Sequence, residues 1–337
     1  HATAYNFLQM RSALVPVVNI AASMQQYLFM FGLAGIAFFK SPILLIIALV
    51  AFGITALFSL ITLPEARRKD DAARAEALNA ADFVILCLPD DAARAAVAMI
   101  ANDTTRVIDA STAHRVAPGW AYGFPEVVGR EAIAAATRVA NPGCYPTGFI
   151  GLLAPLIRAG LLPADWPYTV NAVSGYSGGG KALIERFEAD PDIAFRAYGL
   201  ALGHKHIGEM QRLCGLTHAP VFAPAVIPAH RGMVVEIPLP LAAMPGAAGP
   251  DALRDALAAF YAGSPLVRVA ADPVDELLLR RSTSPWDGLE LRVFGAADGS
   301  QARLVAVLDN LGKGASGAAV QNLNLMAGLP ETAGLRD

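Results

Sequence analysis

One cysteine stands where a reactive thiol would be expected. Cys144 lies in the segment NPGCYPTG at 141–148 and directly precedes the apolar run 149–156. Backbone N–H groups and the helix dipole at the start of a helix both favour a thiolate, and Pro146 suits the first helical turn. The pattern therefore predicts either an activated sulfur nucleophile or an inert, half-buried cysteine at a tight turn.

Two histidines could exchange protons with that thiol. His204 and His206 lie in GHKHIGEM at 203–210 and would share a face on a strand but not on a helix. Glu209 lies three residues after His206, so on a helix its carboxylate could orient the imidazole. A metal site would need a third ligand, and none is evident. We therefore favour a general acid–base histidine acting with Cys144 and predict no metal.

Other candidate groups lie in glycine-rich and strand-end segments. GYSGGGKA at 175–182 almost matches a phosphate-binding P-loop, but Ala182 replaces the hydroxyl that would bind magnesium, which excludes a nucleotide triphosphatase. A glycine loop that lets a ligand approach its backbone stays open. Arg115 would suit a carboxylate or phosphate, although an ordinary surface arginine is the simpler interpretation.

An α/β pattern from Pro64 onward must position these residues. Apolar strands at 83–88 and 106–109 flank a helix at 91–100, which is the βαβ signature of a parallel sheet. DASTAHR at 109–115 follows the second strand, at the end where open α/β sheets bind ligands. Further elements are predicted as a helix from Cys144 to about 159, strands at 168–174, 234–239, 289–294 and 302–308, and helices at 251–261 and 318–327.

Length and charge limit the class of protein. The 337 residues suffice for two domains, and a net charge of −3 gives no electrostatic case for nucleic acid. Three widely separated cysteines do not form a disulfide framework and indicate a reducing compartment.

The first 63 residues differ from the rest of the chain. Lys40 is the one charged residue between positions 14 and 63, and the apolar stretches 14–39 and 43–63 are each long enough to cross a bilayer. Basic residues at 11 and 67–69 would place both ends in the cytoplasm. We predict a transmembrane helical hairpin in the inner membrane; the alternative is a buried hairpin in a soluble core.

Five motifs occur in order from Pro64 to the end: NPGCYPTG, SGYSGGGK at 174–181, HKHxxE at 204–209, HRGM at 230–233 and NLGKGASG at 310–317. With these motifs the chain resembles the N-acetyl-gamma-glutamyl-phosphate reductases, in their shorter bacterial type. The resemblance implies an NADPH-dependent enzyme of arginine biosynthesis. In that reaction Cys144 displaces phosphate to form a thioester, which hydride reduces to a semialdehyde.

The resemblance also implies roles and domains. Cys144 would be the nucleophile, His206 the acid–base group and Glu209 the residue that orients it. Substrate would meet Ser111, Arg115, Asn141, His204 and Lys181, and NADP would meet Ser174, Gly175, Gly178, Asn310 and Gly312. The fold would be a truncated, Rossmann-like dinucleotide-binding domain at 64–143, an α+β catalytic and dimerisation domain at 144–302, and a return at 303–337. We therefore expect a cytoplasmic homo-oligomer that binds a small substrate and phosphate.

The N-terminal portion departs from that family. The strand and glycine-rich turn that hold the dinucleotide pyrophosphate are absent before Pro64, so we expect impaired NADP binding. Residues 1–63 resemble part of a family of membrane zinc metallopeptidases but contain no H-E-x-x-H. Two hypotheses follow: a reductase with its chemistry in residues 64–337, or a catalytically silent, membrane-anchored fusion.

Overall fold

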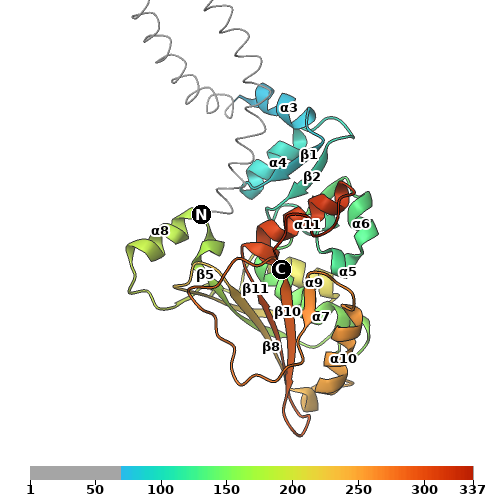
Figure 1. Cartoon of the computed structure of the whole chain (residues 1–337), viewed down its shortest axis with the longest axis vertical. Helices are drawn as coiled ribbons and strands as arrows, with labels where there is room; N and C mark the ends of the chain where they lie inside the picture. Colours follow the sequence, from blue (N-terminus) through green and yellow to red (C-terminus); the bar gives the residue numbers. More distant parts are fainter. Residues whose placement is uncertain (1–69, 337) are drawn as a thin grey trace, which may run out of the picture. The chain divides into compact units, whose positions relative to one another are not determined.

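The computed structural model describes residues 70–336 of the chain (Figure 1). The chain forms two compact units, His1–Ala80 and Ala81–Asp337. The described part of the first unit is helix α3 (Asp71–Asn79), and its N-cap residue Asp70 accepts hydrogen bonds from the N–H groups of Ala72 and Ala73. The predicted apolar hairpin lies outside the described residues. Within residues 70–336, no helix has the length and apolar character needed to span a membrane.

The second unit begins with a parallel sheet of four strands in the order β1-β2-β4-β3. The strands are β1 (Phe83–Leu86), β2 (Arg106–Asp109), β3 (Ala121–Tyr122) and β4 (Arg138–Ala140), and α4 (Asp90–Ala98) connects β1 to β2. The predicted βαβ unit is confirmed. Its central strands are apolar and buried, as a sheet covered on both faces requires.

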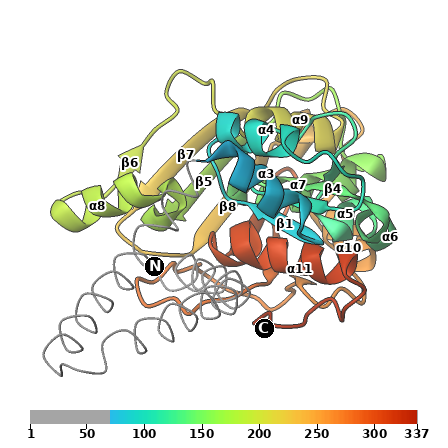
Figure 2. The ribbon, with the colours of Figure 1, turned by 90° about the horizontal axis from the view of Figure 1, so that it is seen from above.

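The C-terminal end of the chain packs on this sheet. Helix α11 (Gly317–Met326) contacts β2 and α6 (Arg130–Ala135) (Figure 2). Ala319 and Met326 of α11 share an apolar cluster with Ile108 and Val139 of the sheet. Gly328, at φ +69°, follows the helix, as predicted for a glycine that ends it. Residues far apart in the sequence therefore complete one layer.

A mixed sheet of seven strands follows, in the order β6-β7-β5-β8-β11-β10-β9. Its strands are β5 (Thr169–Gly175), β6 (Arg196–Ala197), β7 (Val221–Ile227), β8 (Met233–Leu239), β9 (Val267–Val269), β10 (Leu289–Gly295) and β11 (Ala302–Leu308). Helices α7 (Cys144–Arg158), α9 (Ile207–Cys214) and α10 (Pro250–Phe260) pack with this sheet in the main apolar core. Gly148 of α7 lies so close to β8 that a Cβ there would be 2.8 Å from Val235.

The remaining elements are short. Helices α5 (Pro125–Val128) and α8 (Lys181–Ala189) and the 3₁₀ turns η1 (Tyr176–Gly179) and η2 (Leu241–Ala243) connect the strands. A π-helical turn, η3 (Gly312–Ser316), follows β11 and leads directly into α11. Such turns are rare and are frequent at functional sites.

Candidate active site

Cys144 is the first residue of α7, as the sequence predicts. Gly143 is the N-cap, and Thr147 donates from its N–H and its hydroxyl to the Gly143 carbonyl. Burial raises the pKa of the Cys144 thiol to about 11, with Arg115 acting to lower it and Glu209 acting to raise it. Burial therefore opposes the thiolate that the start of a helix would favour. A base must remove the proton before this sulfur can attack.

His206 is buried at the N-cap of α9, with 7% of its surface exposed. Its Nδ1 atom has no hydrogen-bond partner among residues 70–336, and its backbone N–H donates to Nδ1 of His204 at 3.2 Å. The two rings lie 4.7 Å apart, and both approach Tyr145, which follows Cys144. The histidines thus occupy a turn, rather than the strand or helix considered from the sequence.

Burial sets the protonation state of this pair. It lowers the pKa of His204 to about 4 and, with the nearby Arg115 cation, holds the pKa of His206 well below its usual range. Both imidazoles are therefore neutral at neutral pH and can accept a proton.

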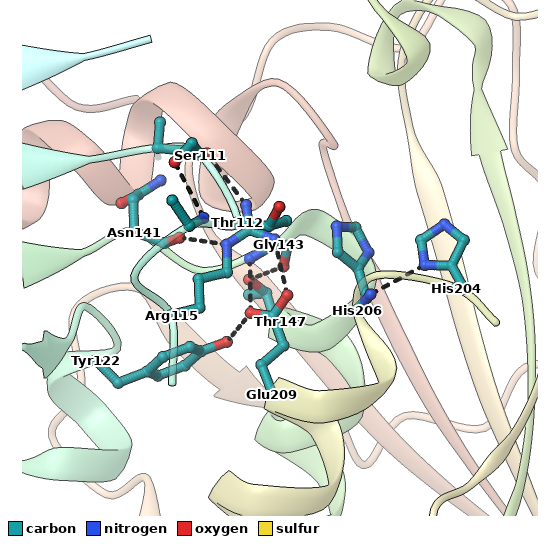
Figure 3. A network of polar contacts seen from close by, with 12 residues as sticks. Ser111, Thr112, Arg115, Tyr122, Asn141, Gly143, Thr147, His204, His206 and Glu209 are labelled. Atoms are coloured by element: carbon teal, nitrogen blue, oxygen red, sulfur yellow. Dashed lines mark hydrogen bonds and ion pairs between the residues drawn. The ribbon is translucent and has the colours of Figure 1, made fainter. Parts of the chain in front are cut away.

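Glu209 does not orient His206, and that prediction is wrong. Its Oε1 accepts from Arg115 Nη1 at 2.8 Å, and its Oε2 accepts from the Tyr122 hydroxyl at 2.6 Å and the Gly143 N–H at 3.2 Å (Figure 3). No hydrogen bond joins Glu209 to His206 in the described structure. A buried carboxylate is best stabilised by a guanidinium, and here that partner lies on the other side of the carboxylate.

Arg115 is not a surface residue, because its side chain is only 9% exposed. Its Nε donates to the Asn141 carbonyl at 3.0 Å and its Nη2 to the Ala110 carbonyl at 3.2 Å. A guanidinium carries five N–H donors, and with the bond to Glu209 three of them are engaged by described residues. Two donors remain for an anion.

Gly143 lies where three of these side chains meet. A Cβ there would lie 2.7 Å from Arg115 Nη1, 2.7 Å from His206 Nε2 and 2.8 Å from Glu209 Oε1. We expect Gly143→Ala to destabilise the fold by about 1–3 kcal/mol, because the added methyl group must displace these buried groups. Urea unfolding measures the loss. Gly208→Ala is the matched control, since nothing lies within 4 Å of its Cβ position; equal losses in both variants would contradict the prediction.

Ser111 follows the carboxyl end of β2 and lies next to two side chains, Asp109 and His114, that were not predicted from the sequence. Its N–H and hydroxyl donate to the buried Asp109 carboxylate at 2.9 and 2.7 Å. Nδ1 of His114 lies 2.6 Å from the same carboxylate, and the His114 ring stacks on Trp120 at 4.2 Å. Asp109 and His114 both fall in the strand-end segment where ligands were expected, which was the one available signal.

Asn141 is 1% exposed, and its side chain is already engaged. Its Nδ2 donates to the Ala315 carbonyl at 3.0 Å, and its Oδ1 accepts from Asn322 at 3.2 Å. The contact of Asn141 with substrate stays a prediction. In the described structure its side chain connects the segment before Cys144 to η3.

The structure brings the two glycine-rich motifs together. Asn310 Nδ2 donates to the Ser177 hydroxyl at 3.0 Å, and its Oδ1 accepts from the Gly232 N–H at 2.9 Å. A Cβ on Gly178 would lie 3.3 Å from Asn310 Nδ2. Ser174 is buried beside them and donates to the Gly175 carbonyl at 3.0 Å. The two segments therefore contact each other, and their contact with NADP stays a prediction.

Two of these glycines are required by packing. A Cβ on Gly175 would lie 2.8 Å from the Arg231 backbone, and one on Gly312 would lie 1.8 Å from the Trp286 carbonyl. Lys181, by contrast, is 87% exposed on α8 and pairs with Glu185 at 3.6 Å. The structure gives Lys181 no contact with the group around Cys144.

The motif at 310–317 forms one wall of the site. A Cβ on Gly314 would lie 2.9 Å from Cys144 Cβ, so η3 packs directly on the cysteine. The next residue toward the N terminus, Lys313, is 1% exposed and pairs with buried Glu126 at 2.7 Å. This pair could not be predicted from the sequence, because a lysine in a glycine-rich turn usually faces water. Within residues 70–336, no three side chains of metal-binding type form a group.

Comparison with solved structures defines the fold class. The chain has the fold of aspartate semialdehyde dehydrogenase II from Vibrio cholerae, with a TM-score of 0.57 and 18% identity over 74% of this chain and 80% of that one. The Francisella tularensis enzyme gives a TM-score of 0.57 at 12% identity, over 75% and 84%. The family described as "Semialdehyde dehydrogenase, dimerisation domain" matches residues 144–310. The chain is therefore an α/β protein of the semialdehyde dehydrogenase fold.

Sequence relatives identify the family within that class. The chain is 51% identical to N-acetyl-gamma-glutamyl-phosphate reductase of Burkholderia ambifaria over 278 residues, which cover 80% of this chain and 88% of the relative. It is 48% identical to N-acetyl-gamma-glutamyl-phosphate reductase 2 of Nostoc sp. over 293 residues, or 82% and 91%. The chain belongs to the N-acetyl-gamma-glutamyl-phosphate reductase family.

The N-terminal part matches a second family. The family described as "Putative neutral zinc metallopeptidase" matches residues 1–112, which extends beyond the 63 residues expected from the sequence. No H-E-x-x-H occurs in the chain.

Proposed function

We propose that this chain reduces N-acetyl-gamma-glutamyl phosphate to N-acetylglutamate semialdehyde with NADPH, through a thioester on Cys144, as a step of arginine biosynthesis. One observation carries the proposal: the chain is 51% identical to two named reductases over 80% of its length. Cys144 lies in the first of the family motifs.

The residues around the sulfur suit acyl transfer. His206, neutral and buried, takes the thiol proton of Cys144, and the resulting thiolate attacks the acyl carbon of the substrate. The carbon–oxygen bond to phosphate breaks, phosphate leaves with its electron pair, and a thioester remains on the sulfur. We assign stabilisation of the negative charge that develops to the Arg115 N–H groups that described residues do not engage, with Ser111 and His204 as further substrate contacts.

Hydride is the group that bound NADPH supplies, and the described residues fit one end of this cofactor. The backbone of η3 packs on Cys144, and Asn310 and Ser174 lie next to it, so these segments would hold the nicotinamide close to the thioester. The turn after β1 has the sequence LPDD at 88–91, so α4 begins with Asp90 and Asp91. Carboxylates at a helix N-terminus disfavour a pyrophosphate. Residues 70–336 therefore account for the nicotinamide end of NADP only.

We also propose the domain division and assembly. Residues 64–143 and 303–337 form the dinucleotide-binding part, and 144–302 form the catalytic part through which copies of the chain associate. The match of a dimerisation-domain family to 144–310 supports this assignment.

The reverse reaction tests the function. The full chain, given N-acetylglutamate semialdehyde, NADP and inorganic phosphate, should produce NADPH, and the rate should fall to background when phosphate is omitted, because phosphate is the group that releases the acyl chain from the sulfur. A folded chain without turnover at saturating phosphate would overturn the proposal and support the catalytically silent fusion.

A further inference from the structure

Glu209 forms the centre of a buried network of side chains that also holds the backbone before Cys144. The carboxylate is 2% exposed, and its partners Tyr122 and Arg115 are buried with it. Tyr122 comes from β3, Arg115 from the segment after β2, and Glu209 from α9. Three separate elements therefore converge on one carboxylate (Figure 3).

This network binds both an N–H group and a carbonyl group of the segment 141–143, which we call the cysteine loop. Glu209 Oε2 accepts from the Gly143 N–H at 3.2 Å, and Arg115, paired with Oε1, donates from Nε to the Asn141 carbonyl at 3.0 Å. A helix N-terminus leaves its first N–H groups without partners. Here the N–H of the residue before Cys144 has a charged acceptor, which fixes where α7 begins.

The same network places two opposite charges beside the thiol. The groups facing Cys144 are Arg115, Glu209 on α9, Tyr145 on α7, and the neighbouring Tyr198 and His206. Burial and its surroundings keep His206 and the tyrosines neutral at neutral pH. Burial raises the pKa of Glu209, and Arg115, Tyr122 and the Gly143 N–H act to lower it. Arg115 and Glu209 are the charged pair, and their effects on the thiolate oppose each other.

We propose that Glu209 is a positioning residue for Cys144: it fixes the cysteine loop through Gly143 and offsets the positive charge of Arg115. The thiol then stays protonated until a base takes the proton. The proposal rests on the proposed function for one point, the role of Cys144 as nucleophile.

Alkylation of Cys144 by iodoacetamide tests this on the full chain. Cys87 and Cys214 are the other two cysteines of the chain, so the modified peptides are quantified separately by mass spectrometry. Glu209→Gln keeps an oxygen for Gly143 and removes the negative charge, so Cys144 should react about threefold faster at neutral pH. A shift of one pKa unit changes the thiolate fraction tenfold, and the lower nucleophilicity of the more acidic thiol partly offsets this. Arg115→Gln should slow the reaction about threefold.

The opposite signs separate an electrostatic role from a merely structural one. Tyr122→Phe removes one hydrogen bond from the same carboxylate but leaves both charges, so its alkylation rate should stay near that of the unmodified chain. Equal directions for Glu209→Gln and Arg115→Gln, or changes below about 1.5-fold in both, would overturn the proposal. Circular dichroism confirms that each variant is folded.

Two further comparisons keep the result decisive. If Arg115→Gln unfolds, the pH of half-maximal alkylation of Cys144 tests the proposal instead. Glu209→Gln should lower this pH, whereas Tyr122→Phe should leave it unchanged. The assay needs no substrate. If the two variants change the alkylation rate in opposite directions but the chain shows no turnover, the reductase function is rejected and the role of Glu209 stands. If the chain shows turnover but the alkylation rates do not change in this way, the role of Glu209 is rejected and the reductase function stands.

Discussion

Replacing Cys144 by serine should lower phosphate-dependent turnover by about 10⁴-fold or more. The reason is the environment of the side chain. Burial already raises the pKa of the thiol to about 11, and a serine hydroxyl in the same place is a far weaker acid, so His206 could not generate its anion. Initial rates of NADPH formation at saturating semialdehyde and phosphate measure the effect.

Cys87→Ser is the control for this experiment. Cys87 is exposed and follows β1, whereas Cys144 is the first residue of α7. The control should keep the full rate within about twofold, as expected for a surface substitution. A Cys144→Ser enzyme that retains more than a few per cent of the rate would show that the reaction does not pass through this sulfur.

The contrast between Cys144 and Glu209 shows what the sequence could predict about the site. The turn before a helix, the cysteine at its first position and the apolar run behind it are local features, and local features predicted α7 and its first residue correctly. The partner of Glu209 depends on Arg115 and Tyr122, which lie 94 and 87 residues away. Spacing of three residues suggested His206, but a buried carboxylate pairs with the nearest cation, and tertiary structure alone determines which cation that is.

The fold shows the same division. Buried strands and amphipathic helices were recognisable from their periodicity, so β1, β2, β10, β11 and α10 were predicted close to their observed bounds. Strand order was not predicted, because it depends on pairings such as that of β8 with β11, whose residues lie far apart. The partners of the Asn141 side chain were not predicted for a related reason, since they are Ala315 and Asn322, far away in the sequence.

Replacing Lys313 by methionine should destabilise the protein by about 3–5 kcal/mol, because it leaves a buried carboxylate without its counter-charge. Lys313 Nζ lies 2.7 Å from Glu126 Oε1, 2.5 Å from Gln321 Oε1 and 5.3 Å from the centre of the Phe124 ring. Burial acts to raise the pKa of Glu126, but the Lys313 ammonium, with the hydrogen bonds from Lys313 and Gln321, holds that pKa below its ordinary value. Denaturant unfolding at neutral pH measures the loss.

The pH dependence identifies the cause. Without Lys313, burial should raise the folded-state pKa of Glu126 above its unfolded value, so the loss is largest at neutral pH and shrinks in acid, where the carboxyl group takes a proton. The double variant Lys313→Met with Glu126→Gln removes both charges and should recover most of the stability. A loss below about 1 kcal/mol, or one that does not change with pH, would show that the pair is not the main stabilising contact of η3.

The wall that η3 forms against Cys144 has a consequence for the order of events during protein synthesis. Gly314 packs on Cys144 at a sequence separation of 170. Lys313 contacts Glu126 at a separation of 187, and Asn322 contacts Gly123 at a separation of 199. When α7 leaves the ribosome, the segments that bury its cysteine have not yet been made. Contacts this distant in sequence form late, because closing such long loops costs entropy before any contact compensates for it. The nascent chain therefore carries an incompletely enclosed thiol until its last helix has been translated and has packed on the four-stranded sheet.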